Sequence, residues 1–267
     1  MKIGVFDSGL GGLLITSAIR KALPDHDLVY LGDTLHVPYG RRSRETIYEL
    51  TRKAVEYLFT AQNCQLVILA CNTASASALR RLQQTWLKDT YPDRCVLGVV
   101  VPTLEEAIWL GHTRVGLIAT ESTVKSGVYE EELHKLKPNI EIFPKAAPLL
   151  APMIEHDGID YIRPVLEDYL QPLKDESVQS LILGCTHYCR LSDMIGDIMG
   201  PDVNMISQAE ITPPSLRDYL KRHPEQDEKL SRHGQNIFLV TDLTDGYAKA
   251  AEDAYGRPVD LELVSYI

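Results

Sequence analysis

The chain has 267 residues, of which 45% are hydrophobic and 24% charged, a balance typical of a globular protein with one large or two modest domains. Its net charge of −10 disfavours a nucleic-acid-binding function, because such proteins usually carry a basic patch. No apolar run approaches the ~18 residues that a membrane span needs, and the short apolar stretch at residues 3–6 is not a signal peptide. We therefore expect a cytoplasmic protein that does not contact the membrane.

Strands are predicted at residues 3–6, 28–31, 66–70 and 96–101, with helices that end near residue 22 and span 41–62 and 73–87. The second half repeats this scheme, with strands at 115–119, 140–143 and 181–183 and helices over 122–136, 161–170 and from about 191. Repeated strand–helix units predict parallel sheets with helices on both faces.

The two halves resemble each other in sequence. Residues 3–6 match 115–118 at an offset of 112, and residues 66–73 match 180–187 at an offset of 114. Buried strands share a composition, but a cysteine follows the strand in both copies, which favours an internal duplication. We therefore predict two pseudo-symmetric α/β lobes with mainly parallel sheets and an active site in the cleft between them.

The five cysteines are Cys64, Cys71, Cys95, Cys185 and Cys189. An odd number fits free thiols in a reducing compartment. No CxxC pair occurs, so we expect no metal site. Cys71 and Cys185 each follow a predicted buried strand, so pseudo-symmetric lobes would put one thiol on each side of a bound ligand.

The surroundings of these two thiols favour acid/base chemistry. Cys71 precedes a predicted helix, whose N-terminus should lower the thiol pKa from about 8.5. His187, two residues after Cys185, could stabilise its thiolate or relay protons. Asp7 could serve Cys71 in the same way, and Glu155 could serve Cys185. The position of Glu155 in the sequence fits a solvent-exposed helix face equally well.

Two thiols on opposite faces of one carbon atom suit racemisation. One thiolate removes the α-proton of an amino acid, and the other thiol returns a proton from the opposite face, with a bell-shaped pH profile. Hydrogen-bond donors around the carboxylate must stabilise the carbanion. The glycine-rich turn at residues 7–12 could supply such donors.

These motifs resemble the cofactor-independent glutamate racemases of the aspartate/glutamate racemase superfamily. The matching segments come in family order and cover nearly the whole chain: FDSGLGG (6–12), LGDT (31–34), PYG (38–40), ACNTAS (70–75), PLLAP (148–152) and LGCTHY (183–188). The resemblance implies that Cys71 and Cys185 are the two bases, assisted by Asp7, Glu155 and His187. The substrate contacts that it implies come from Asp7, Ser8, Tyr39, Gly40, Asn72, Thr73, Thr186 and His187.

The resemblance also implies a first lobe of residues 1–97 plus 207–267, a second lobe of residues 98–206, and a homodimer. It implies glutamate as substrate, no cofactor, and a cellular role in supplying D-glutamate for bacterial peptidoglycan and thus for the cell wall. Some family members carry an N-terminal extension linked to activation by a peptidoglycan precursor. The first predicted strand here starts at residue 3, so we expect no such activation.

Some positions depart from the family pattern, namely Thr103, Ala119, Cys189 and the segment 207–210. They leave the acid/base set intact but leave substrate preference open, so a racemase of aspartate or another amino acid is the first alternative. A non-catalytic amino-acid-binding protein is the second, although it would not need paired thiols. A pyridoxal-phosphate racemase is the third, but no lysine lies in a suggestive motif.

Overall fold

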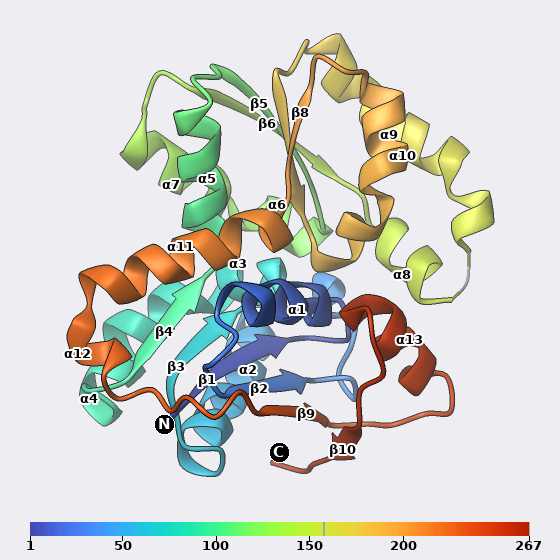
Figure 1. Cartoon of the computed structure of the whole chain (residues 1–267). Coiled ribbons are helices and arrows are strands. Elements are labelled where there is room, and N and C mark those ends of the chain that lie inside the picture. The colour runs from blue at the N-terminus through green and yellow to red at the C-terminus, as the bar shows by residue number, and fades with distance from the viewer. Residues whose placement is uncertain (157, 267) are drawn as a thin grey trace.

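The computed structural model describes residues 1–156 and 158–266, which form two α/β units stacked on each other (Figure 1). The first unit holds a six-stranded sheet, and the second holds a four-stranded sheet. In spatial order, the first sheet contains β10 (Leu261–Leu263), β9 (Asn236–Val240), β2 (Leu28–Gly32), β1 (Lys2–Asp7), β3 (Cys64–Leu69) and β4 (Cys95–Gly98). The second contains β6 (Glu141–Ala146), β5 (Arg114–Ala119), β7 (Ser180–Gly184) and β8 (Asn204–Ile206).

The two sheets share one topology. Strands β5 to β8 lie in the order β6-β5-β7-β8, which repeats the order β2-β1-β3-β4 of the first sheet, and each pairing between neighbours is parallel. The strands related by the sequence offsets, β1 with β5 and β3 with β7, therefore hold equivalent places. The predicted fold class, two α/β lobes with parallel sheets, is confirmed.

Helices cover both faces of each sheet. Around the first sheet lie α1 (Gly12–Ala22), α2 (Arg44–Thr60), α3 (Asn72–Arg81), α4 (Lys88–Thr90), α11 (Gln208–Arg222), α12 (Pro224–Asp227) and α13 (Tyr247–Tyr255). Around the second lie α5 (Val100–Trp109), α6 (Glu121–Ser126), α7 (Val128–Leu136), α8 (Leu150–Glu155), α9 (Arg163–Asp175) and α10 (Ser192–Met199). A π-helical segment, Leu82–Leu87, extends α3, and 3₁₀ turns span Tyr39–Arg41, Ile159–Tyr161 and Thr186–Leu191.

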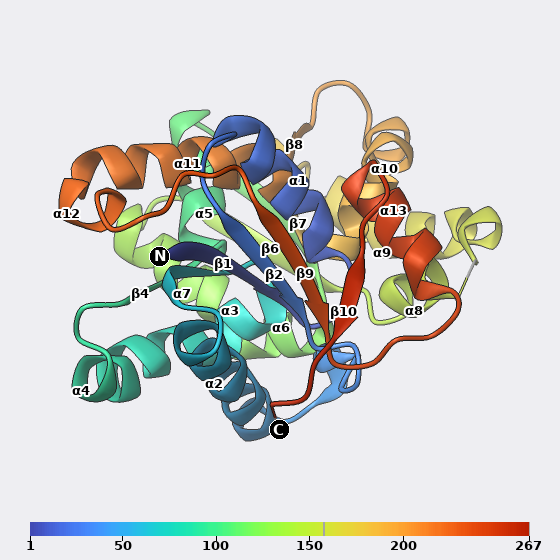
Figure 2. The same ribbon diagram turned by 60° about the horizontal axis from the view of Figure 1, so that its bottom comes forward.

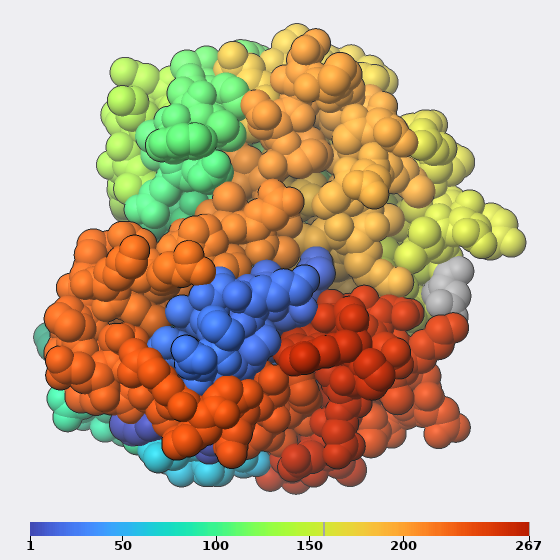
Figure 3. Space-filling view, in the orientation of Figure 1, coloured from blue at the N-terminus to red at the C-terminus, as the bar shows by residue number. Residues whose placement is uncertain are grey.

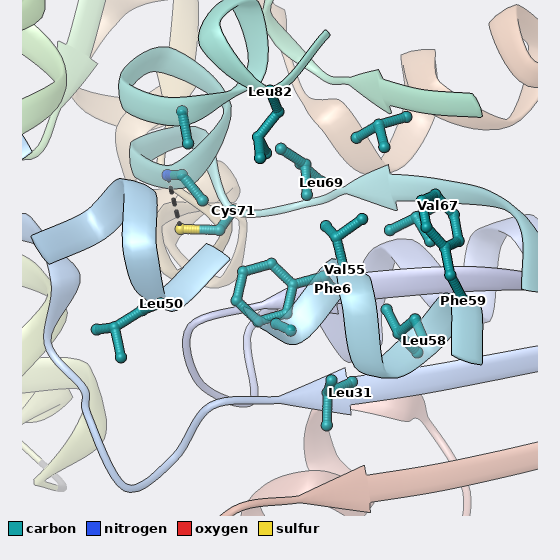
Figure 4. Packing of buried hydrophobic residues seen from close by; sticks show 14 of the residues in the cluster. Phe6, Leu31, Leu50, Val55, Leu58, Phe59, Val67, Leu69, Cys71 and Leu82 are labelled. Carbon is teal, nitrogen blue, oxygen red and sulfur yellow. Dashed lines mark hydrogen bonds between the residues drawn. The ribbon is translucent and has the colours of Figure 1, made fainter. Parts of the chain in front are cut away.

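The strands at the centre of the first sheet are buried on both faces, as parallel strands between two helix layers should be. Phe6 of β1 packs in one hydrophobic cluster with Leu58 of α2 and Leu69 of β3. Its neighbour Val5 packs in the opposite cluster, against α1. Cys71 lies at the edge of the Phe6 cluster (Figure 4), so a continuous core supports the backbone that carries this thiol.

Two predicted elements differ from the structure. The helix predicted over residues 122–136 is broken into α6 and α7 at Gly127, whose positive φ of 65° interrupts the right-handed helix. The strand predicted over residues 96–101 ends at Gly98, because α5 already begins at Val100.

The C-terminal segment contributes elements that the sequence pattern did not predict. β9 pairs with β2, and β10 pairs with β9, so this segment extends the first sheet (Figure 2). The long helix α11 packs against α1 and α5 and covers one side of the lobe junction (Figure 3). The lobe boundaries at 97/98 and 206/207 stay a prediction. Among the described residues, no helix is long and apolar enough to cross a membrane.

The junction between β2 and the C-terminal segment depends on one buried carboxylate. Asp27 accepts hydrogen bonds from the backbone N–H groups of His233 (3.1 Å) and Gln235 (2.9 Å), just before β9. Burial alone would raise the pKa of Asp27, but hydrogen bonds from Ser231, Gln235 and His233 outweigh it and hold the pKa below its usual range. The ionised carboxylate therefore stabilises the folded state.

We expect Asp27→Asn to lower the free energy of unfolding by roughly 1–3 kcal/mol at pH 7, because the variant loses charge-assisted hydrogen bonds. A lowered folded-state pKa gives stability that is present above the unfolded pKa of about 3.9 and is lost as the pH falls toward the folded value. In urea titrations, the difference in free energy of unfolding between the unaltered protein and Asp27→Asn should therefore become smaller from pH 4 to pH 2. A difference that stays constant over this range would contradict the assignment.

Candidate active site

Three of the predicted acid/base residues lie at the carboxyl ends of strands. Asp7 is the last residue of β1, Cys71 follows β3, and Cys185 directly follows β7. Because the strands of each sheet are parallel, these residues lie at one edge of their own sheet. All three side chains are buried.

Hydrogen bonds join the two edges across the lobe junction. The Thr186 hydroxyl, after β7, donates to the Asp7 carboxylate at 3.2 Å. The Thr73 hydroxyl, in the first turn of α3, lies 2.9 Å from the hydroxyl of Thr120 and 3.3 Å from that of Thr123. The carboxyl ends of the two sheets therefore meet, and the predicted site lies where they meet.

Cys71 caps the N-terminus of α3. Its sulfur accepts a hydrogen bond from the Ala74 N–H at 3.4 Å, drawn as a dashed line in Figure 4, and lies 3.4 Å from the Ser8 hydroxyl. Burial first, and then the negative charge of Asp7, raise the pKa of Cys71 to about 12 despite these hydrogen bonds. The Ala74 N–H at the helix N-terminus lowers this pKa as expected, but burial outweighs it, so the net shift is upward. Cys71 is therefore a protonated thiol near neutral pH.

Cys185 has a different environment. Its sulfur lies 3.6 Å from Nδ1 of His187, and Nε2 of the same ring lies 2.9 Å from the Glu155 carboxylate. Burial alone would lower the pKa of His187, but its hydrogen bonds to Cys185 and Glu155 raise that pKa well above the ordinary value. His187 thus connects the Cys185 sulfur to the Glu155 carboxylate. Glu155 contacts His187, so it can affect the thiol through the imidazole.

Asp7 lies between these two environments. Its Oδ1 accepts the Gly9 N–H at 2.9 Å, and its Oδ2 accepts the Thr186 hydroxyl. Burial raises the pKa of Asp7, while the charge of His187 and these hydrogen bonds oppose the rise. The carboxylate is thus close enough to interact with the thiol of the first lobe and with the imidazole of the second.

The predicted substrate-binding residues all lie at this junction: Asp7, Ser8, Tyr39, Gly40, Asn72, Thr73, Thr186 and His187. Tyr39 is buried and donates its hydroxyl to Asp33 at 2.6 Å. A Cβ atom added at Gly40 would come within 2.9 Å of Thr120, so this glycine allows the two lobes to approach each other closely.

Further residues whose side chains contact this set were not predicted, among them Asp33, Thr120, Thr123, Tyr129 and Gln208. The internal offset of 112 residues pairs Ser8 with Thr120, so the duplication held a signal for this position. Tyr129 and Gln208 lie on α7 and α11 and reach Asn72 only through the packing of the lobes, which no local sequence pattern indicates. Within residues 1–156 and 158–266, no cluster of three or more His, Cys, Asp or Glu side chains could hold a metal ion.

Comparisons with known sequences agree on one family. A family model described as Asp/Glu/Hydantoin racemase matches residues 13–212. The chain is 39% identical to the glutamate racemase of Phenylobacterium zucineum, over 98% of this chain and 99% of the relative. It is 42% identical to the glutamate racemase of Aquifex aeolicus, over 83% of this chain and 84% of the relative.

Solved structures show the same relationship. A glutamate racemase isoform from Bacillus anthracis is 32% identical with a TM-score of 0.89, covering 99% of this chain and 97% of the other. The Francisella tularensis glutamate racemase, solved in complex with D-glutamate, gives the same values. An aspartate racemase from Picrophilus torridus, 20% identical with a TM-score of 0.59 over 83% of this chain and 95% of the other, shares the fold alone.

The different surroundings of the two thiols predict different reactivities. At pH 7.5 iodoacetamide should modify Cys185 well before Cys71, because the thiolate is the nucleophile and a pKa of about 12 leaves Cys71 almost entirely protonated. Exposure does not explain such an order, since the two residues are 7% and 5% exposed. Peptide mass spectrometry over time measures both rates. His187→Gln should slow the modification of Cys185 only, and faster modification of Cys71 in the unaltered protein would refute the assignment.

Proposed function

Because the chain belongs to the Asp/Glu/hydantoin racemase family, we propose that it is a glutamate racemase that uses Cys71 and Cys185 as two opposed acid/base groups. The observation that supports this mechanism most is that the two thiols follow equivalent strands, β3 and β7, of two lobes whose strand ends meet. A ligand held there has one thiol from each lobe beside it.

The proton chemistry follows from the two environments. Burial keeps the proton on Cys71, and we propose that Cys185, which contacts His187, is the thiolate of the starting pair. The Cys185 thiolate takes the α-proton from one face of glutamate, and the Cys71 thiol gives its proton to the opposite face of the carbanion. The product is the other enantiomer, and the two thiols have exchanged protonation states. In this state the protein can react with the enantiomer that has just formed, so the reverse reaction needs no further group.

The carbanion needs stabilisation because the α-proton of an amino acid is a weak acid. Donors at the junction can hydrogen-bond to the substrate carboxylate, on which negative charge develops. The candidates are the Ser8, Thr73 and Thr186 hydroxyls, together with the Asn72 amide. All four residues are buried, so their hydrogen bonds to a charged group act with little competition from water. The scheme uses only side chains of this chain, and we propose that it needs no cofactor.

Glutamate is favoured over aspartate by the relatives. The two relatives named above are glutamate racemases at 39% and 42% identity, whereas the aspartate racemase is similar at 20% identity and in fold alone. A binding protein without turnover would not need a protonated thiol and a stabilised thiolate at equivalent strand ends. We therefore rank both alternatives below glutamate racemisation.

We further propose a cytoplasmic homodimer that supplies D-glutamate for peptidoglycan. Exposed apolar side chains support self-association, among them Leu149, Tyr161 and Leu243, which are 46%, 78% and 44% exposed. Sedimentation equilibrium at micromolar concentration should give twice the chain mass. A monomer at all concentrations would remove the dimer from the proposal.

The reaction itself can be tested with L-glutamate in D2O without added cofactor. At low conversion, two opposed bases should place solvent deuterium in the D-glutamate formed and leave little in the remaining L-glutamate. Chiral chromatography with mass spectrometry measures both pools. Equal levels of deuterium in both enantiomers early in the reaction would contradict the two-base mechanism. Turnover of aspartate and not of glutamate would identify aspartate as the substrate.

Each reacting thiol should be essential. Cys71→Ser and Cys185→Ser should lower racemisation by at least about 100-fold, because a hydroxyl is a far weaker acid than a thiol. Cys95→Ser is the matched control, since Cys95 contacts Tyr219 away from the junction and should keep its activity. Near-normal turnover in either of the first two variants would rule out the paired-thiol mechanism.

A further inference from the structure

A buried polar cluster joins both lobes and the α11 helix beside Cys71. The Oδ1 atom of Asn72, the first residue of α3, accepts the Tyr129 hydroxyl of α7 at 2.6 Å. The same Oδ1 accepts the Nε2 group of Gln208, the first residue of α11, at 3.3 Å. Asn72, Tyr129 and Gln208 are each no more than 1% exposed. Three elements that are far apart in sequence thus converge on one oxygen atom.

The hydrogen bonds leave one end of the Asn72 amide free in this structure. Two donors, the Tyr129 hydroxyl and the Gln208 Nε2 group, face Oδ1. The Oε1 atom of Gln208 is also buried without a partner among the described residues. In the observed orientation Nδ2 is a buried donor that has no partner among the described residues. An unpaired buried donor costs about 1–3 kcal/mol, and an acceptor from a bound ligand removes this cost.

Tyr129 can hold the amide over the whole working range of pH. Burial raises the pKa of Tyr129 well above its ordinary value, so the phenol remains a donor. Tyr129 belongs to the second lobe and Asn72 to the first, so this hydrogen bond forms only when the lobes are packed together. Tyr129 therefore holds the Asn72 amide in this orientation only while the two lobes are in contact.

We infer that Tyr129 and Gln208 are positioning residues that aim the Asn72 amide nitrogen at the carboxylate of the substrate when the two lobes are docked. The inference rests on the proposed function, because the acceptor for the Nδ2 group is the carboxylate of the amino-acid substrate. Neither residue touches the reacting atoms. Their contribution is to keep one hydrogen-bond donor oriented before the substrate arrives, which saves the cost of orienting it during the reaction.

Tyr129→Phe tests this inference by removing one oxygen atom. We expect kcat/KM for glutamate to fall by about tenfold, mainly through KM, because the Asn72 amide can then rotate. Gln208→Met should have a smaller effect in the same direction, since its hydrogen bond is longer. L- and D-glutamate have equal free energies, so kcat/KM must change by the same factor for both enantiomers, which checks the assay.

Tyr219→Phe is the matched control. Tyr219 lies on α11 like Gln208, but its hydroxyl contacts Cys95 and not Asn72, so activity should stay within about twofold. Circular dichroism and thermal unfolding confirm that each variant is folded. Tyr129→Phe activity within twofold of the unaltered protein, in a folded variant, would overturn the inference.

A double-mutant cycle separates positioning from general stability. In an Asn72→Ser background, Tyr129→Phe should have no further effect, because the amide that it positions is gone. A tenfold loss that persists in this background would show that Tyr129 acts on stability alone. Titration calorimetry with D-glutamate, carried out with every variant in a Cys185→Ser background, gives the same comparison without turnover. An unaltered protein that is inactive on glutamate would instead refute the proposed function itself.

Discussion

Parallel pairing of every strand with its neighbours is the constraint on which the site depends. In a parallel sheet all strands end at one edge, so the residues that follow β1 and β3 lie together, as do those that follow β5 and β7. The two edges meet and are joined by the hydrogen bond from Thr186 to Asp7. Chemistry that needs groups on both sides of a ligand can therefore use one residue from each lobe, without long loops.

Equivalent positions in the two lobes do not have equivalent electrostatics. Cys71 lies in an apolar environment beside the Asp7 carboxylate, and both features favour the neutral thiol. Cys185 lies beside an imidazole that Glu155 helps to keep charged. Burial and the Asp7 carboxylate keep the proton on Cys71, whereas the neighbours of Cys185 are His187 and, through it, Glu155. The pseudo-symmetry thus sets the positions of the two thiols, and the side chains around them make their environments different.

The sequence predicted those features that depend on local pattern. The strand pattern and the repeated cysteine turns identified β1, β3, β5 and β7 and placed Cys71 and Cys185 at strand ends. The sequence could not predict the high pKa of Cys71. The helix N-terminus, which lowers the pKa, is visible in the sequence, but the burial that raises it is a property of the folded chain. The sequence also missed the contacts of Tyr129 and Gln208 with Asn72, which exist only once separate lobes have packed.

The second lobe is inserted in the first, since the chain leaves the first sheet after β4 and returns through α11. Two covalent tethers therefore join the lobes, near Gly98 and near Gln208. A domain with one connection to its neighbour can rotate in any direction, whereas two connections restrict rotation to the axis that passes through both of them. A relative motion of the lobes must therefore bend both connections together, which limits the mutual positions that the two thiols can take.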